Sequence, residues 1–281
     1  MRDFRYRLVN VFAESALAGN PLCVFEDARG LDDATMQALA LQFNLSETTF
    51  ILPSERAAAR VRIFTPTFEM PFAGHPTLGT SHVVRALGLG GDALALEMKA
   101  GLIPVAARGD EWTLSAPEPA SRPAGAAAAD LARFLQLDSA DIGENPLWID
   151  TGSEQLIVPL RNVEAVRRAN PDGSTLDEWP RSGAGRAMIY VWAHAGPGAV
   201  ESRFFFTKHT SVLEDPGTGA ACANLGGWML VTRQPLPVAL QVAQGSAVGR
   251  PCRLGLAVGP DRSIRVSGRV IELGSGVIRL P

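Results

Sequence analysis

The hydrophobic residues of this 281-residue chain fall mostly into short runs typical of β-strands, with a few longer stretches at helical spacing. Residues 4–12 and 21–25 are rich in Val, Phe and Leu, and Gly19-Asn20-Pro21 lies between them, so they predict two strands joined by a turn. Further strands are predicted at 46–52, 59–65, within 93–115, around 155–158, and at 187–193, 200–206, 238–243, 253–258, 264–271 and 276–280. Many short strands with few helices predict an α+β protein and not alternating βαβ units.

Three segments outside these strands predict ordinary helices. In the first, apolar residues recur at i, i+3, i+4 and i+7, namely Met36, Leu39, Ala40 and Phe43. Asp32 or Asp33 can cap the start of this helix, and Asn44 suits its end. Two more helices are predicted at about 128–136 and 162–169.

One pattern of residues occurs twice, once in each half of the chain. Arg62-Ile63-Phe64 precedes Gly74-His75-Pro76-Thr77-Leu78-Gly79, and Arg203-Phe204-Phe205 precedes Glu214-Asp215-Pro216-Gly217-Thr218-Gly219. The two copies are separated by about half of the chain, which predicts two copies of one unit that runs from a strand through a loop to a helix N-terminus. The copies differ where chemistry is expected, because one carries a histidine and the other an aspartate.

A proline-rich section lies a little before the midpoint of the chain: Ala116-Pro117-Glu118-Pro119-Ala120-Ser121-Arg122-Pro123. It has small residues and no hydrophobic period, which is typical of a linker. We therefore predict two domains, residues 1–118 and 124–281, each with one copy of the repeated motif. The last strand is expected to be able to cross back to the first domain.

The helix expected after each copy of the motif has an unusual composition. Proline suits the first position of a helix, so the helices are predicted to begin at Pro76 and Pro216, with His75 and Asp215 before them as caps. Small or apolar residues then lie on nearly every side of two segments, 79–87 and, more strictly, 217–230. A helix that is apolar all round is buried all round. We expect two core helices that neighbouring strands approach closely.

The starts of these two helices are the first candidate for a site. The unpaired N–H groups and partial positive charge of a helix N-terminus suit a carboxylate or a phosphate. Two such ends that meet between the halves would form a small anion-binding cleft. Many buried helices begin in this way and bind nothing, so the spacing alone leaves both interpretations open.

The composition is that of a folded globular protein and argues against several classes of partner. Lys and Arg number 26 against 29 Asp and Glu, a net charge of −3, so no surface for nucleic acid or an anionic membrane is expected. No apolar stretch approaches the roughly 20 residues that span a bilayer, and no signal peptide is evident. Cys23, Cys222 and Cys252 match no disulfide or metal pattern, and the four histidines are scattered. We expect a cytoplasmic protein without a metal site.

Several short motifs follow one another along almost the whole chain: Val11-Phe12, Ala18 to Phe25, Ser46 to Phe50, Phe72 to Thr77, Asp150-Thr151-Gly152 before Gln155 to Leu160, Glu214 to Gly219, and Gln244-Gly245 with Gly249-Arg250-Pro251. Together they resemble the phenazine-biosynthesis PhzF-like isomerase family. The resemblance implies a diaminopimelate epimerase-like fold of two pseudo-symmetric halves, each a β-barrel-like sheet wrapped around a central helix, with the active site between them. It also implies a homodimer and an isomerase that needs no cofactor.

The same resemblance separates two kinds of chemistry. In the diaminopimelate epimerases, two cysteines at the starts of these helices act as a pair of bases, whereas this chain has His75 and Asp215 there. Cys222 is predicted to lie about two turns inside the second helix, where it cannot replace the missing thiol. A two-thiol racemase mechanism is therefore disfavoured.

In PhzF-like isomerases a glutamate that matches Glu47 moves a proton between carbons of an unsaturated ring acid. The resemblance thus implies Glu47 as general acid and base, assisted by His75 and Asp215, because one carboxyl can remove a proton and return it elsewhere. The substrate-binding residues that we predict with them are Asn20, Gly74, Pro76, Thr77, Gly152, Ser153, Gly217, Thr218 and Gly219. By its sequence neighbours alone, Glu47 is expected on the solvent face of a half-buried strand, and His75 and Asp215 can be caps only.

Three functions are compatible with these residues. The first is an isomerase acting on a small carboxylate; the others are an amino-acid racemase or epimerase using Glu47 or Cys222, and a non-catalytic small-molecule-binding protein. One position departs from the family, since Ala220 stands where many members carry a serine after Thr-Gly. The departure leaves the substrate open, including the phenazine-type reaction.

Overall fold

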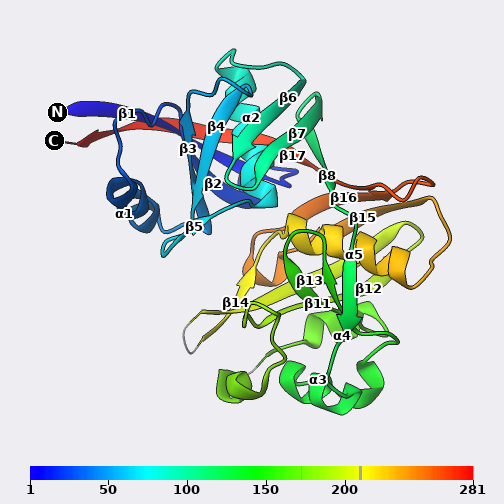
Figure 1. Cartoon of the computed structure of the whole chain (residues 1–281). Helices are drawn as coiled ribbons and strands as arrows, with labels where there is room; N and C mark the ends of the chain where they lie inside the picture. Colours follow the sequence, from blue (N-terminus) through cyan, green and yellow to red (C-terminus); the bar gives the residue numbers. More distant parts are fainter. Residues whose placement is uncertain (172, 209–210, 281) are drawn as a thin grey trace. The chain divides into compact units, whose positions relative to one another are not determined.

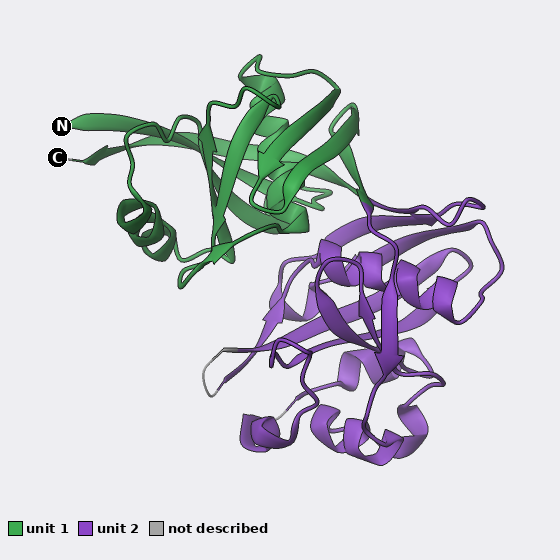
Figure 2. Cartoon of the chain, in the orientation of Figure 1, with its two compact units in different colours: residues 1–115, 267–281 green, residues 116–266 purple. Residues whose placement is uncertain are grey.

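The computed structural model describes residues 1–171, 173–208 and 211–280 (Figure 1). The chain forms two compact units, one from residues 1–115 together with the C-terminal strand from 267, and one from residues 116–266 (Figure 2). The two ends of the chain lie in the same unit because β1 (Arg2–Val11) pairs antiparallel with β17 (Ile264–Leu280). No helix among the described residues is long and apolar enough to cross a bilayer.

The first unit contains one central helix, one outer helix and a set of mostly antiparallel strands. Its further elements are β2 (Asn20–Phe25), α1 (Asp33–Phe43), β3 (Glu47–Leu52), β4 (Ala59–Phe64), β5 (Glu69–Met70), α2 (Gly74–Ala86), β6 (Ala93–Met98), β7 (Gly101–Arg108) and β8 (Glu111–Ala116). Two strand pairs are parallel, β2 with β3 and β4 with β6. The pairs β1–β2, β3–β4, β4–β5, β6–β7 and β7–β8 are antiparallel.

The second unit repeats this order of elements. It contains β9 (Ala120–Pro123), α3 (Ala128–Leu135), β10 (Leu147–Asp150), β11 (Glu154–Pro159), α4 (Val163–Arg168), β12 (Met188–Gly196), β13 (Ala199–Lys208), β14 (Ser211–Asp215), α5 (Gly219–Val231), β15 (Val238–Gln244) and β16 (Cys252–Val258), with short 3₁₀ turns at Ser139–Asp141, Gly173–Glu178 and Ser246–Val248. Its parallel pairs are β11 with β12 and β13 with β15, in the same places as in the first unit. The duplication predicted from the repeated motif is therefore confirmed.

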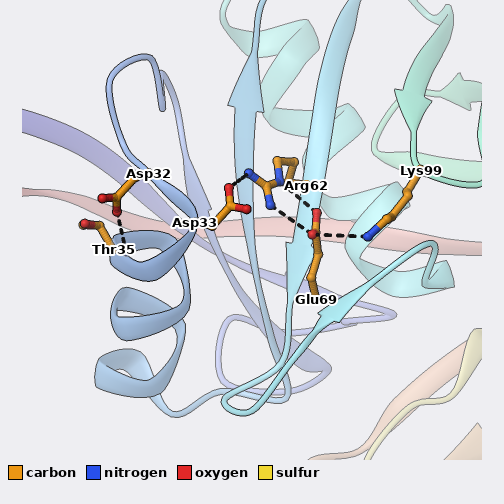
Figure 3. A network of polar contacts seen from close by, with 6 residues as sticks. All are labelled: Asp32, Asp33, Thr35, Arg62, Glu69 and Lys99. Carbon is orange, nitrogen blue, oxygen red and sulfur yellow. Dashed lines mark hydrogen bonds and ion pairs between the residues drawn. The ribbon is translucent and has the colours of Figure 1, made fainter.

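The repeated arginine is part of this shared framework. On β4, Arg62 makes an ion pair with Glu69 on β5 (Nε to Oε1, 2.8 Å), and its guanidinium lies over Phe64, 5.0 Å from the ring centre. Figure 3 shows that Arg62 also binds Asp33 at the start of α1, while Lys99 approaches Glu69. These contacts tie β4, β5 and α1 together just before the chain enters α2.

Arg203 has the same role in the second unit. It pairs with Glu214 on β14 (Nη2 to Oε2, 2.7 Å) and lies 4.8 Å from the ring centre of Phe205. Its Nη1 donates to backbone carbonyls at the end of α4, including that of Ala169, whereas Nη1 of Arg62 binds the carboxylate of Asp33. The arginine copies are thus explained by folding, because each anchors the strand pair that leads into a motif helix.

The two motif helices are buried, as their composition predicts. Ten of the thirteen residues of α2 and eleven of the thirteen of α5 are buried. A Cβ atom on Gly79 would lie 2.7 Å from Leu22 Cδ2, and one on Gly227 would lie 2.8 Å from Ile149 Cγ2. The strands therefore approach these helices more closely than any side chain at those glycines would allow.

The predicted starts of both helices are wrong. α2 begins at Gly74 after Ala73, so Pro76 is its third residue, and α5 begins at Gly219 after Thr218, so Pro216 lies outside it. Proline is accommodated at the third position because that N–H has no helical partner either. Asp215 is not a cap, since it is the last residue of β14 and pairs with Phe204.

Two other segments differ from expectation and one agrees closely. Residues 120–123 of the predicted linker form β9, which pairs antiparallel with β10, and the two predicted C-terminal strands are one continuous strand, β17. The helix predicted around residue 36 is confirmed: the side chain of Asp32 accepts from the N–H of Thr35 at 2.8 Å, and Asn44 ends α1 in a left-handed conformation.

Candidate functional site

In the first unit, the structure brings Glu47 and His75 together. Glu47 is the first residue of β3, beside Leu22 of the parallel strand β2, and its side chain is 15% exposed. His75 is the second residue of α2 and its side chain is 7% exposed, with Nε2 3.4 Å from Glu47 Oε2. A nearly buried carboxyl beside a buried imidazole is an arrangement suited to proton transfer.

His75 is neutral in this environment. Burial lowers the pKa of its imidazole to about 3, although a hydrogen bond to the backbone of Pro21 acts in the opposite direction. Nδ1 lies 3.4 Å from the side-chain amide of Asn20, at the start of β2. A neutral ring can donate to a carboxylate or accept from a carboxylic acid. His75 can therefore form a hydrogen bond with Glu47 both when the Glu47 carboxyl is ionised and when it is protonated.

This burial predicts how stability depends on pH. The pKa of His75 is about 3 when folded and 6.5 in the unfolded chain, so between these values the unfolded state binds more protons. The free energy of unfolding should then fall as the pH is lowered from 7 to 5, by about 2 kcal/mol from this group. Urea unfolding should show a smaller loss for His75→Gln. The exposed His194→Gln serves as the control, and an equal loss in wild type and His75→Gln would contradict the prediction.

At the start of α2, only some of the predicted substrate donors are available. The N–H and the hydroxyl of Thr77 both donate to the carbonyl of Ala73, at 3.2 Å and 2.7 Å. Pro76 has no N–H, so the first-turn N–H groups at this end are those of Gly74 and His75. The first-turn N–H groups that are candidates for binding an anion therefore lie earlier in the chain than the predicted Thr77.

In the second unit, Asp215 is held by its neighbours on the way into α5. The hydroxyl of Thr218 donates to Asp215 Oδ2 at 2.5 Å, and both residues are partly exposed. The N–H of Thr218 is used within the chain by Gln244, which leaves the first-turn N–H groups of α5, beginning with Gly219, as donors. Gly217 lies between the strand and the helix.

The predicted residues Gly152 and Ser153 form a loop fixed by a residue that the sequence did not indicate. Asn224, buried in α5, accepts from the N–H and hydroxyl of Thr151 at 2.9 Å and 2.7 Å. Its amide nitrogen donates to the carbonyl of Ser153 and to Gln155 Oε1, both at 2.8 Å. The only available signal was a lone asparagine in an apolar helix, which by itself indicates no particular partner.

The cysteines do not offer a basic thiolate. All three are free and buried, and burial raises the pKa of each thiol well above its ordinary value. Cys222 lies in the first turn of α5, nearer to the helix start than predicted, but it is fully buried. Because the thiolate is the reactive form, this arrangement does not favour the Cys222 racemase. Among the described residues, no three His, Cys, Asp or Glu side chains are grouped as metal ligands would be.

The described residues thus form two local clusters. One is Glu47, His75 and Asn20 in the first unit, and the other is Asp215, Thr218 and Gln244 in the second. That they act in one site stays a prediction.

Comparison with known proteins identifies the family. The model of the phenazine biosynthesis-like protein family matches residues 9–276. The chain belongs to this family. Among its relatives, an uncharacterized isomerase of Pasteurella multocida is 35% identical over 284 residues, covering 100% of this chain and 96% of the relative. The trans-2,3-dihydro-3-hydroxyanthranilate isomerase of Pseudomonas aeruginosa is 35% identical over 266 residues, covering 89% and 88%.

A solved structure of this family confirms the fold. The Bacillus anthracis phenazine biosynthesis protein of the PhzF family superposes with a TM-score of 0.88 at 26% identity, covering 100% of both chains. The predicted diaminopimelate epimerase-like class of fold, with a central helix in each half, is therefore correct. Membership of this family of isomerases makes the chain an enzyme of the isomerase class.

Proposed function

We propose that the chain shifts a proton within a small carboxylate-bearing substrate, with Glu47 as both general base and general acid. The observation that carries this proposal is the position of Glu47, nearly buried and 3.4 Å from the neutral, buried His75. Glutamate side chains are mostly exposed in folded proteins, and buried titratable groups gather at functional sites.

The reaction has a simple balance. Glu47 removes a proton from a carbon beside an unsaturated bond, the electron pair moves along the conjugated system, and the protonated Glu47 returns the proton to another carbon. His75 accompanies Glu47 in both states, as a donor to the carboxylate and as an acceptor from the acid. Asp215 accepts a hydrogen bond from a substrate amine or hydroxyl. The first-turn N–H groups of the motif helices hold the substrate carboxylate.

We propose unsaturated ring acids as the substrate class, with trans-2,3-dihydro-3-hydroxyanthranilate as the first compound to test. A relative named for that compound is 35% identical to this chain, and its name describes a molecule with a carboxylate, an amine and a hydroxyl. Ala220 lacks the hydroxyl that many family members have there. We propose that Thr218, whose hydroxyl already donates to Asp215, supplies this function instead.

The test is incubation in deuterated water with this compound and a panel of amino and ring acids, with deuterium incorporation read by mass spectrometry. We expect one deuterium at a new carbon of an isomerised ring acid. Deuterium at the α-carbon of an amino acid would favour the racemase or epimerase alternative. Tight binding without any exchange would favour a non-catalytic binding protein, and either result would overturn the proposed isomerisation.

We further propose a cytoplasmic homodimer. The family resemblance supports the dimer, and the three free cysteines suit a reducing compartment. Sedimentation equilibrium of the purified protein tests the homodimer, and a monomer at micromolar concentration would contradict it.

A further inference from the structure

Gln244 joins the two ends of the short segment that contains Asp215. It is the last residue of β15 and only 1% exposed. Its Nε2 donates to the carbonyl of Asp215 at 2.8 Å and to Thr218 Oγ1 at 3.0 Å. Its Oε1 accepts from the N–H of Thr218 at 3.3 Å. One buried amide thus holds the backbone at both ends of the segment and also the Thr218 hydroxyl.

These contacts determine the direction in which the Thr218 hydroxyl points its proton. An amide nitrogen can only donate, so Thr218 Oγ1 is the acceptor in its contact with Gln244. The one proton of the hydroxyl then goes to Asp215 Oδ2. Asp215 is therefore an acceptor at this oxygen, which suits a residue that accepts from a substrate amine or hydroxyl and does not supply the moving proton.

The first unit has no such donor at the corresponding position. The parallel ladders β4–β6 and β13–β15 have the same register when counted from the repeated arginines, so Met98, the last residue of β6, corresponds to Gln244. The hydroxyl of Thr77 contacts Met98 Sδ at 3.6 Å. A thioether has no proton to give. The amide is thus present only in the unit whose motif carries the aspartate.

We propose that Gln244 is a positioning residue for Asp215, acting through Thr218. The proposal rests on the proposed function, because it assumes that Asp215 accepts a hydrogen bond from the substrate. Gln244 and Thr218 do not need to touch the substrate for this role. Gln244 orders the hydroxyl, and the hydroxyl orients the carboxylate.

The test replaces Gln244 with methionine, the residue type at the corresponding position 98 of the first unit. In Gln244→Met the Thr218 N–H loses its acceptor, and the Asp215 carbonyl and the Thr218 hydroxyl lose their donor. With trans-2,3-dihydro-3-hydroxyanthranilate we expect kcat to fall about 10- to 100-fold, because the hydrogen bonds that orient Thr218 and Asp215 are lost, while KM changes less than about threefold. Hydrogen exchange of the Thr218 amide should accelerate by about tenfold or more. Met98→Leu, a change of similar volume in the first unit, is the matched control.

A second variant tests the proposal even if Gln244→Met does not fold. Gln244→Glu keeps the shape, but the introduced carboxylate cannot donate, so the Thr218 proton turns from Asp215 toward that carboxylate. Activity of this variant should recover as the pH is lowered and the introduced carboxylate becomes protonated, whereas wild type shows no such recovery. The charged or titratable groups near this position include Asp215 on β14, whose carbonyl accepts from Gln244, and Cys252 on β16, which is paired with Gln244 and has Arg250 beside it.

The outcomes separate the two proposals. If wild type leaves the compound unchanged and exchanges no deuterium with any ring acid, the proposed function fails. If wild type is active and Gln244→Met retains its kcat, the positioning role of Gln244 is overturned alone. An unchanged exchange rate of the Thr218 amide in Gln244→Met would overturn it whether or not the enzyme is active.

Discussion

Glu47→Gln should reduce turnover of the substrate by about 10³-fold while leaving the protein folded, because general acid–base catalysis by one side chain contributes about 10²- to 10⁴-fold. The amide has nearly the shape of the carboxyl, but it neither takes up nor releases a proton near neutral pH. Deuterium incorporation should be lost to the same extent, since removal and return of the proton use the same group. Steady-state kinetics and exchange in deuterated water measure the two effects.

A matched control distinguishes this loss from a general effect of removing a carboxylate. Glu97 on β6 lies in the same unit with a side chain 24% exposed, and its contacts are Ser54 and Arg56. Glu97→Gln should keep its turnover near that of wild type. If Glu47→Gln keeps more than a tenth of the wild-type turnover, Glu47 is not the group that moves the proton.

Gly245→Ala should lower the free energy of unfolding by about 3–5 kcal/mol, at the upper end of the range for single substitutions. Gly245 follows Gln244 and has a φ of 83°. A Cβ atom there would overlap the backbone oxygens of both Arg250 and Pro216. Backbone atoms cannot rotate away as side-chain ends do, so the segment next to Asp215 must move. We expect catalysis to be lost with stability.

Gly249→Ala separates the two reasons for this effect. Gly249 also has a positive φ, 70°, but a Cβ atom there would have nothing within 4 Å. Gly249→Ala should therefore lower the free energy of unfolding by only about 1–2 kcal/mol, the cost of placing an alanine in the left-handed conformation. Urea unfolding of both variants gives the difference. Equal losses would mean that the close approach of Gly245 to Pro216 has no energetic consequence.

The predictions that succeeded depend on neighbours in sequence. The cap at Asp32 and the left-handed end at Asn44 are decided within one helical turn, so the residues of α1 are sufficient to place it. The burial of α2 and α5 follows from composition, because a helix without a polar face has no side to turn to water. The repeat was visible because both arginines have the same structural role.

The predictions that failed depend on pairing through space. Pro216 looked like the first residue of a helix, but β14 continues through Asp215 because it pairs with β13, and that pairing delays the helix to Gly219. The strand at residues 120–123 exists because β10 offers it a partner. Local propensity depends on neighbouring residues alone, so it cannot predict either pairing partner.

The family, the class of fold and the candidate acid–base residue could be predicted from short motifs ordered along almost the whole sequence, and the two buried helices from the composition of single segments. The folded chain was needed to see that His75 lies against Glu47 and is neutral, and that Asn224 and Gln244 hold the loops of the second unit. The difference arises because burial and hydrogen-bond direction belong to groups brought together by folding. A lone amide in the sequence does not reveal which donors and acceptors will surround it.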